Sequence, residues 1–122
     1  MARILIVDDD PQVRRMLERS LSANHQVIAA ASVTEADARL GSQVDLIITD
    51  VVMPEINGVE AIPRWRKACP QVKVLAISGG TRKLSPSFNL ESARMQGADA
   101  VLAKPFDLNT LRKQVDLLLQ AG

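Results

Sequence analysis

Residues 4–11 read ILIVDDDP, so that three carboxylates and a proline directly follow four consecutive apolar residues. An uninterrupted apolar run of this length is typical of a strand that is buried on both faces of a parallel sheet. Asp10 is a favourable N-cap and Pro11 a favourable first helical residue, so we expect a strand at 3–7 and a helix at 11–22. The unit leaves Asp8 and Asp9 in the turn between the two elements.

The same alternation of apolar runs and amphipathic segments continues along the chain, five times in all. It predicts an α/β fold with a parallel sheet. Further strands are expected at 26–30, 45–49, 73–77 and 100–103. Further helices are expected from the Ser32 cap to Gly41, up to Ala68 with Pro63 inside, over 88–96 before Gly97, and after the Asp107 cap.

Polar residues follow four of these strands directly. Because the carboxyl ends of parallel strands lie at one edge of a sheet, we expect these side chains to converge there. The residues are Asp8, Asp9, Asp50, Ser78 and Lys104. Taken singly, the aspartates are explained equally well as turn or cap residues, and the serine and lysine as loop residues. Their joint placement favours one functional site.

The chemistry of this set predicts a magnesium site with a carboxylate nucleophile. Crowded carboxylates repel one another, and a hard divalent cation with oxygen ligands removes that repulsion. Asp9 and Asp50 are natural direct ligands, the Val52 carbonyl a third, and Asp8 a ligand through water. Asp50 is also placed to accept a phosphoryl group.

The remaining groups of the set suit the phosphoryl oxygens. Lys104 supplies a compact positive charge, and the Ser78 hydroxyl and Gly79 N–H supply hydrogen bonds.

Composition narrows the class of protein. The 122 residues suit one domain, and 47% hydrophobic with 24% charged residues is typical of a globular protein. A net charge of +1 and an absence of tyrosine give no sign of a nucleic-acid or membrane surface. The chain shows no signal peptide, and its single cysteine, Cys69, suits a reducing cytoplasm.

The full ordered set resembles the response-regulator receiver domain of two-component signalling. The motifs that carry the resemblance are Val7-Asp8-Asp9, Asp50-Val51-Val52-Met53-Pro54, Asn57-Gly58, Ser78-Gly79 and Lys104-Pro105-Phe106. The resemblance covers essentially the whole chain. It implies a flavodoxin-like, doubly wound sheet of five parallel strands in the order 2-1-3-4-5 with five helices. It also implies one receiver domain at 1–122 with no output domain.

The resemblance further implies how the site works. Asp50 would take the phosphoryl group from a histidine kinase, a phosphotransfer protein or a small phosphodonor. Asp8, Asp9, Asp50 and Val52 would hold Mg²⁺, and Ser78 and Lys104 would contact the phosphoryl group. Such a receiver catalyses only its own phosphorylation and dephosphorylation, so we expect a signalling protein and not an enzyme.

The resemblance also implies an output by protein–protein contact. The expected surface is the face of helix 88–96, strand 100–103 and the last helix, with no direct contact to nucleic acid or membrane. The family often carries an aromatic switch residue where Val101 stands. A rotating aromatic side chain is therefore not the expected signal here.

Three other functions fit the pattern less well. A phosphatase of the haloacid-dehalogenase type requires threonine or valine at the position of Gln12. It also has a cap domain, for which this chain is too short. An inert receiver-like module is expected to lack Asp50 or Lys104, and both are present. A flavin-binding module lacks suitable aromatic residues for stacking on the ring.

Overall fold

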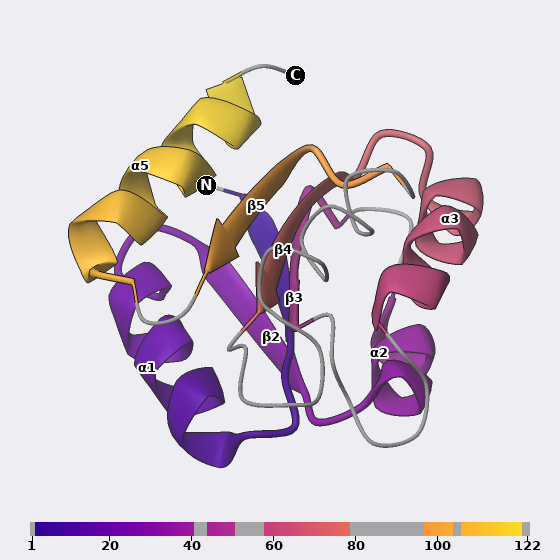
Figure 1. Cartoon of the computed structure of the whole chain (residues 1–122), viewed down its shortest axis with the longest axis horizontal. Coiled ribbons are helices and arrows are strands. Elements are labelled where there is room, and N and C mark those ends of the chain that lie inside the picture. The colour runs from indigo at the N-terminus through magenta and orange to yellow at the C-terminus, as the bar shows by residue number, and fades with distance from the viewer. Residues whose placement is uncertain (1, 41–43, 51–57, 79–96, 104–105, 121–122) are drawn as a thin grey trace.

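The computed structural model describes residues 2–40, 44–50, 58–78, 97–103 and 106–120, apart from the side chains of residues 58–60 and of Ser78. Five parallel strands form one sheet in the order β2-β1-β3-β4-β5 (Figure 1). The strands are β1 (Arg3–Val7), β2 (Gln26–Ala30), β3 (Leu46–Asp50), β4 (Lys73–Ser78) and β5 (Ala100–Ala103). The expected strand order is confirmed. The order reverses between β1 and β3, and ligands of such sheets bind at the carboxyl ends beside that reversal.

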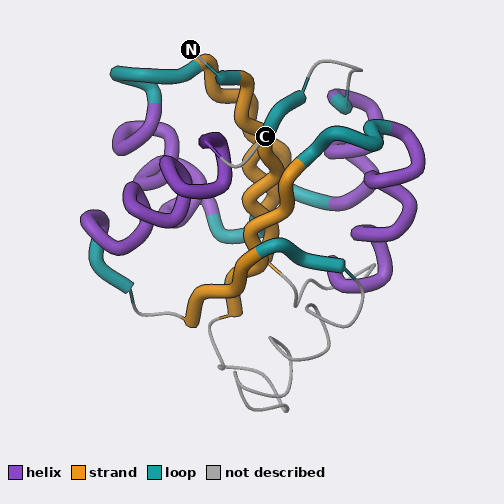
Figure 2. The backbone as a smooth tube through the Cα atoms, turned by 90° about the horizontal axis from the view of Figure 1, so that it is seen from above, coloured by secondary structure: helices purple, strands orange, loops and turns teal. Residues whose placement is uncertain are grey.

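Helices cover both faces of the sheet. Figures 1 and 2 show α1 (Pro11–Leu21) and α5 (Leu108–Gln120) on one face, and α2 (Val33–Arg39) and α3 (Gly58–Ala68) on the other. The fifth helix, expected at 88–96, lies outside the described residues. Among the helices that are described, none is long and apolar enough to cross a membrane.

The core has two halves because successive strand residues point to opposite faces. Leu5, Val7 and Ile47 pack toward α2 and α3, while Ile4 and Ile6 pack toward α1 and α5. Both faces of β1 and β3 are therefore buried, which explains why these strands appear in the sequence as continuous apolar runs.

Capping side chains set the helix starts as expected. The Asp10 carboxylate accepts a hydrogen bond from the Gln12 N–H at 2.9 Å, and Pro11 is the first helical residue. The Ser32 hydroxyl accepts from the Glu35 N–H at 3.1 Å. The Glu35 side chain pairs with Arg39 at 3.2 Å, which reinforces α2 one turn further on.

Several element ends differ from the expected ones. Helix α1 ends at Leu21 with Ser22 as its C-cap, and α2 ends at Arg39 with Leu40 as its C-cap, before the expected Gly41. Strand β3 starts one residue later than expected and includes Asp50, which pairs in register with Ile77 of β4. Because this pairing continues to the polar residue, Asp50 sits on a strand and not in a loop.

Helix α3 is tied to both of its neighbours. The Trp65 indole N–H donates to Asp37 of α2 at 2.9 Å, and Arg64 pairs with the same carboxylate at 2.6 Å. Arg66 donates to the Gly97 carbonyl at 2.9 Å and pairs with Asp99 before β5. Trp65 is also fully buried, so it packs in the core as well as donating its hydrogen bond to Asp37.

Gly97 has φ of 108°, a conformation that favours glycine. A side chain there would also come within 3.3 Å of the Arg66 Nε. The glycine expected to end the helix at 88–96 is thus required by its own backbone.

The cap of α5 makes stability depend on pH. The Asp107 carboxylate accepts from the Thr110 N–H at 2.7 Å, and this hydrogen bond lowers the pKa of Asp107 below its usual 3.8. A carboxyl whose folded pKa is depressed stabilises the fold above its unfolded pKa and loses that contribution as pH falls through the folded pKa. We expect urea unfolding to show that wild type loses its stability advantage over Asp107→Ala as the pH falls from about 5 through the lowered pKa of Asp107.

Asparagine at the same position separates capping from charge. Asn caps helices as well as Asp but does not titrate, so Asp107→Asn should keep its advantage over Asp107→Ala in acid. An advantage of wild type over Asp107→Ala that does not change over this pH range would rule out this role for the Asp107 charge.

Candidate functional site

Three aspartates meet at the carboxyl edge of the sheet, where the strand order reverses. Asp8 and Asp9 directly follow β1, and Asp50 is the last residue of β3. These strands are neighbours, and Val7 is paired with Thr49 in register. The residues that follow this pair, Asp8 and Asp50, therefore lie side by side at the edge of the sheet. One carboxylate oxygen from each aspartate lies within 4.8 Å of the other two. The convergence expected for Asp8, Asp9 and Asp50 is confirmed.

These carboxylates are largely withdrawn from water. Asp8 is 1% exposed and Asp50 is 7% exposed, while Asp9 is half-buried. Asp8, Thr49 and Asp50 are the buried polar or charged residues in the described part of the chain, and all three are at this edge. Burying charge is costly unless it is compensated, so this concentration of polar groups is typical of a functional site.

Backbone hydrogen bonds hold the turn after β1. The Asp10 N–H donates to the Asp8 carboxylate at 2.9 Å, and the Asp8 N–H donates to the Ala30 carbonyl at 3.1 Å. The Arg14 guanidinium reaches back from α1 and donates to the Asp8 carbonyl at 2.7 Å. The Asp8 side chain and peptide group are therefore fixed from two sides.

The Thr49 side chain holds the peptide group of Asp50 by a hydrogen bond. Its hydroxyl is fully buried and donates to the Asp50 carbonyl at 3.0 Å. Sequence reasoning missed both Arg14 and Thr49. A polar residue inside the apolar run 46–49 was the available signal for Thr49, whereas nothing in the helical pattern distinguished Arg14 from its neighbours.

The acidic cluster fits a magnesium ion. It offers three hard oxygen donors from two adjacent strand ends, and a divalent cation would offset their negative charge. No soft sulfur or imidazole donor belongs to the cluster, which matches the oxygen preference of Mg²⁺.

The other predicted site residues are only partly described. Ser78 ends β4 and pairs in register with Ala103 of β5, the residue before Lys104. The Ser78 side chain is not described, and Val52, Gly79 and Lys104 lie outside the described residues. The register therefore brings the strand ends that precede these residues to the same edge as Asp50.

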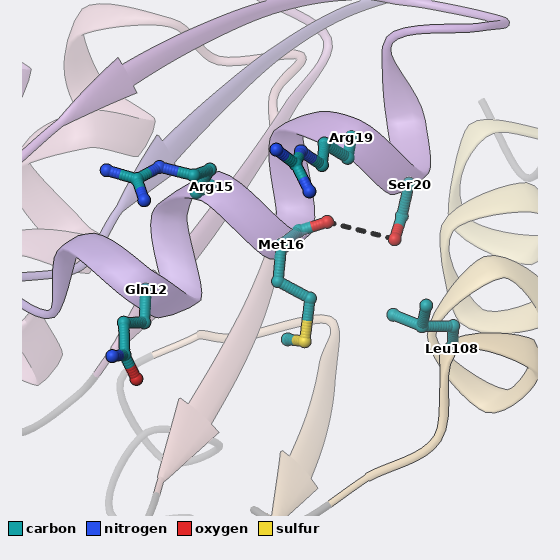
Figure 3. Close-up of a pocket in the computed structure, with 6 residues that line it drawn as sticks. All are labelled: Gln12, Arg15, Met16, Arg19, Ser20 and Leu108. Carbon is teal, nitrogen blue, oxygen red and sulfur yellow. Dashed lines mark hydrogen bonds between the residues drawn. The ribbon is translucent and has the colours of Figure 1, made fainter.

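A groove of about 300 Å³ lies between α1 and α5, and Figure 3 shows the Met16 side chain directed into it. The residues that line it are Gln12, Arg15, Met16, Arg19, Ser20 and Leu108. The Ser20 hydroxyl donates to the Met16 carbonyl at 3.0 Å, so its partner is its own helix. The acidic cluster is separate from this groove.

A second hollow, of about 830 Å³, opens at the opposite edge of the sheet near His25 and Lys73. The His25 Nδ1 accepts from the Ala2 N–H at 3.3 Å. His25 lies in the loop before β2, at the opposite edge of the sheet from the acidic cluster.

Comparison with known proteins assigns the family. Residues 4–116 match the response regulator receiver domain. The chain belongs to this family, the receiver domains of two-component signalling. The match favours the receiver over the phosphatase and flavin-binding alternatives.

Individual relatives agree with this assignment. The response regulator receiver protein CpdR of Brucella abortus is 33% identical over 124 residues, which cover 100% of both chains. The crystal structure of the chemotaxis protein CheY4 of Vibrio cholerae is 31% identical with a TM-score of 0.81, covering 98% of this chain and 99% of that one. The transcriptional regulator NtrC of Azospirillum brasilense is 34% identical over 99% of this chain. The chain spans only 25% of that relative's length.

Proposed function

We propose that Asp50 is the phosphoacceptor and that Asp8, Asp9, Asp50 and the Val52 carbonyl hold the Mg²⁺ ion that its phosphorylation requires. The observation that carries this proposal is the meeting of three carboxylates within 4.8 Å, two of them buried, at the switch point of the sheet. Asp50 is the one member that comes from β3, so it faces the turn that carries the other two.

The reaction is a phosphoryl transfer between a donor and the Asp50 carboxylate. A carboxylate oxygen forms a bond to phosphorus while the phosphorus–nitrogen bond of a donor phosphohistidine breaks, and the imidazole leaves with the bonding electrons. When bound, Mg²⁺ neutralises the charge on the phosphoryl oxygens. Catalysis is then mostly positioning, for which the fixed Asp8 turn and the strand position of Asp50 are suited.

The remaining phosphoryl contacts are assigned from the family resemblance. Lys104 would pair with the phosphorylated Asp50, and Ser78 and Gly79 would donate hydrogen bonds to its oxygens. The donor is a histidine kinase or phosphotransfer protein, as the match to the sensor kinase CckA of Brucella abortus supports. We place this signalling in the cytoplasm, and we propose that the chain turns over no separate substrate.

The proposed output is a change of protein–protein contacts at the face of the 88–96 segment, β5 and α5. Val101 of β5 packs partly buried against the core half that faces α2 and α3. A small aliphatic side chain in that position has no rotating ring to report the state of Asp50. We therefore propose that the signal passes through backbone shifts of β5.

Metal dependence tests the proposed site directly. Intact mass after incubation with acetyl phosphate should show one added phosphoryl group with Mg²⁺ and none when the metal is chelated. Asp9→Asn removes one negative ligand, so it should raise the Mg²⁺ concentration needed for half-maximal uptake by about 10-fold or more.

Asp10→Asn is the matched control for Asp9→Asn. It removes the adjacent, exposed charge while asparagine keeps the helix cap, so its Mg²⁺ requirement should stay close to wild type. An equal shift in both variants would mean that general charge, and not ligation by Asp9, sets the requirement.

A further inference from the structure

We propose that Arg14 is a positioning residue for the metal-binding turn, and this inference rests on the proposed function of Asp8 and Asp9. The Arg14 Nη1 donates to the Asp8 carbonyl at 2.7 Å and is partly buried with it. Arg14 lies in the first turn of α1, where its own N–H donates to the Asp10 carbonyl at 3.1 Å. Arg14 is thus hydrogen-bonded to both ends of the Asp8–Asp10 turn, to Asp8 through its guanidinium and to Asp10 through its backbone N–H.

The Arg14 side chain contacts the peptide group of the turn. The contacted atom is the Asp8 main-chain oxygen, which lies between the two predicted ligand residues along the chain. Together with the Asp10 N–H on the Asp8 carboxylate, it fixes the orientation of the peptide that joins Asp8 to Asp9. Removing contacts that orient metal ligands typically lowers metal affinity by about 10- to 100-fold.

The charge of Arg14 opposes this effect, which makes the sign of the outcome decisive. A guanidinium close to the site repels a divalent cation, so charge alone predicts that removing Arg14 tightens Mg²⁺ binding. If Arg14 instead positions the turn, removing it should weaken Mg²⁺ binding. Arg15, the next residue of α1, is exposed and is one of the residues that line the groove described above (Figure 3), so it carries the same charge at a different position on the helix.

The test is the Mg²⁺ dissociation constant by isothermal titration calorimetry for wild type, Arg14→Met, Arg14→Lys and Arg15→Met. We expect Arg14→Met to weaken binding by about 10-fold or more, the size of effect typical of residues that orient metal ligands. Arg14→Lys should also weaken it, because the shorter point charge does not reproduce the guanidinium contact. Arg15→Met should leave binding unchanged or tighten it slightly.

Hydrogen exchange of the metal-free proteins gives a second readout that needs no ion. The Asp10 amide, which donates to the Asp8 carboxylate, should exchange faster in both Arg14 variants, while the β1 amides keep wild-type protection. Faster exchange throughout β1 would indicate general destabilisation and would overturn the local role.

The outcomes separate the two proposals. Wild-type protein that does not bind Mg²⁺ would refute the proposed metal site itself. Wild-type protein that binds Mg²⁺, with Arg14→Met equal to or tighter than Arg15→Met, would refute the positioning role alone. Arg14→Lys equal to wild type would also refute it, because charge would then suffice.

Discussion

Replacing Asp50 with asparagine should abolish phosphoryl uptake from acetyl phosphate in the presence of Mg²⁺. An amide oxygen is a poor nucleophile, and the substitution leaves the size of the buried side chain almost unchanged. Intact mass spectrometry should show the added phosphoryl group on wild type and only unmodified chain for Asp50→Asn. Because β3 pairs through Asp50 by its backbone, the variant should keep the fold.

Asp116→Asn provides the control for that loss. Asp116 is exposed on α5, so the substitution removes the same charge away from the acidic cluster and should leave uptake unchanged. Full labelling of Asp50→Asn would assign the phosphoacceptor to another residue, with Asp8 and Asp9 the first candidates for peptide mapping.

The same substitution should make the metal-free protein more stable. Three carboxylates that lie within 4.8 Å repel one another in the absence of a cation, and Asp50→Asn removes one of the charges. Thermal unfolding in chelator should therefore occur at a higher temperature in the variant than in wild type. Added Mg²⁺ should raise the wild-type midpoint more than that of the variant.

Trp65→Ala should lower the free energy of unfolding by about 3–5 kcal/mol, the usual cost of emptying a large aromatic site. Trp65 is fully buried in the core half that faces α2 and α3, and its indole N–H is the partner of Asp37. The loss is a large part of the roughly 5–15 kcal/mol that holds a domain of this size together. Urea unfolding followed by circular dichroism measures it.

Two further variants divide this effect into packing and hydrogen bonding. Trp65→Phe keeps most of the apolar volume but leaves Asp37 without the indole donor, so it should cost less than Trp65→Ala. Leu117→Ala, at a side chain that is 62% exposed, should change the unfolding free energy by no more than about 0.5 kcal/mol. A loss for Trp65→Ala as small as that for Leu117→Ala would contradict the packing role.

Local sequence signals predicted the elements well because the interactions that set them span few residues. The Asp10 and Asp107 caps bond to N–H groups two and three residues further on, and the apolar runs alone decide which segments are buried on both faces. The helix and strand ends were less predictable. Asp50 joins β3 because β4 continues alongside it, and that pairing depends on a segment more than 20 residues away along the chain.

The pattern of apolar runs and polar residues was enough to predict which residues stand at the carboxyl ends of the strands, and hence that Asp8, Asp9 and Asp50 share one edge. The folded structure was needed to see how close their oxygens come, which of them are buried, and that the Arg14 side chain turns back to contact Asp8. The contacts of Trp65 with Asp37 and of Arg66 with Asp99 were likewise decided by folding. Strand ends follow from local patterns of burial, whereas side-chain contacts depend on strand register and helix placement, which the whole core fixes together.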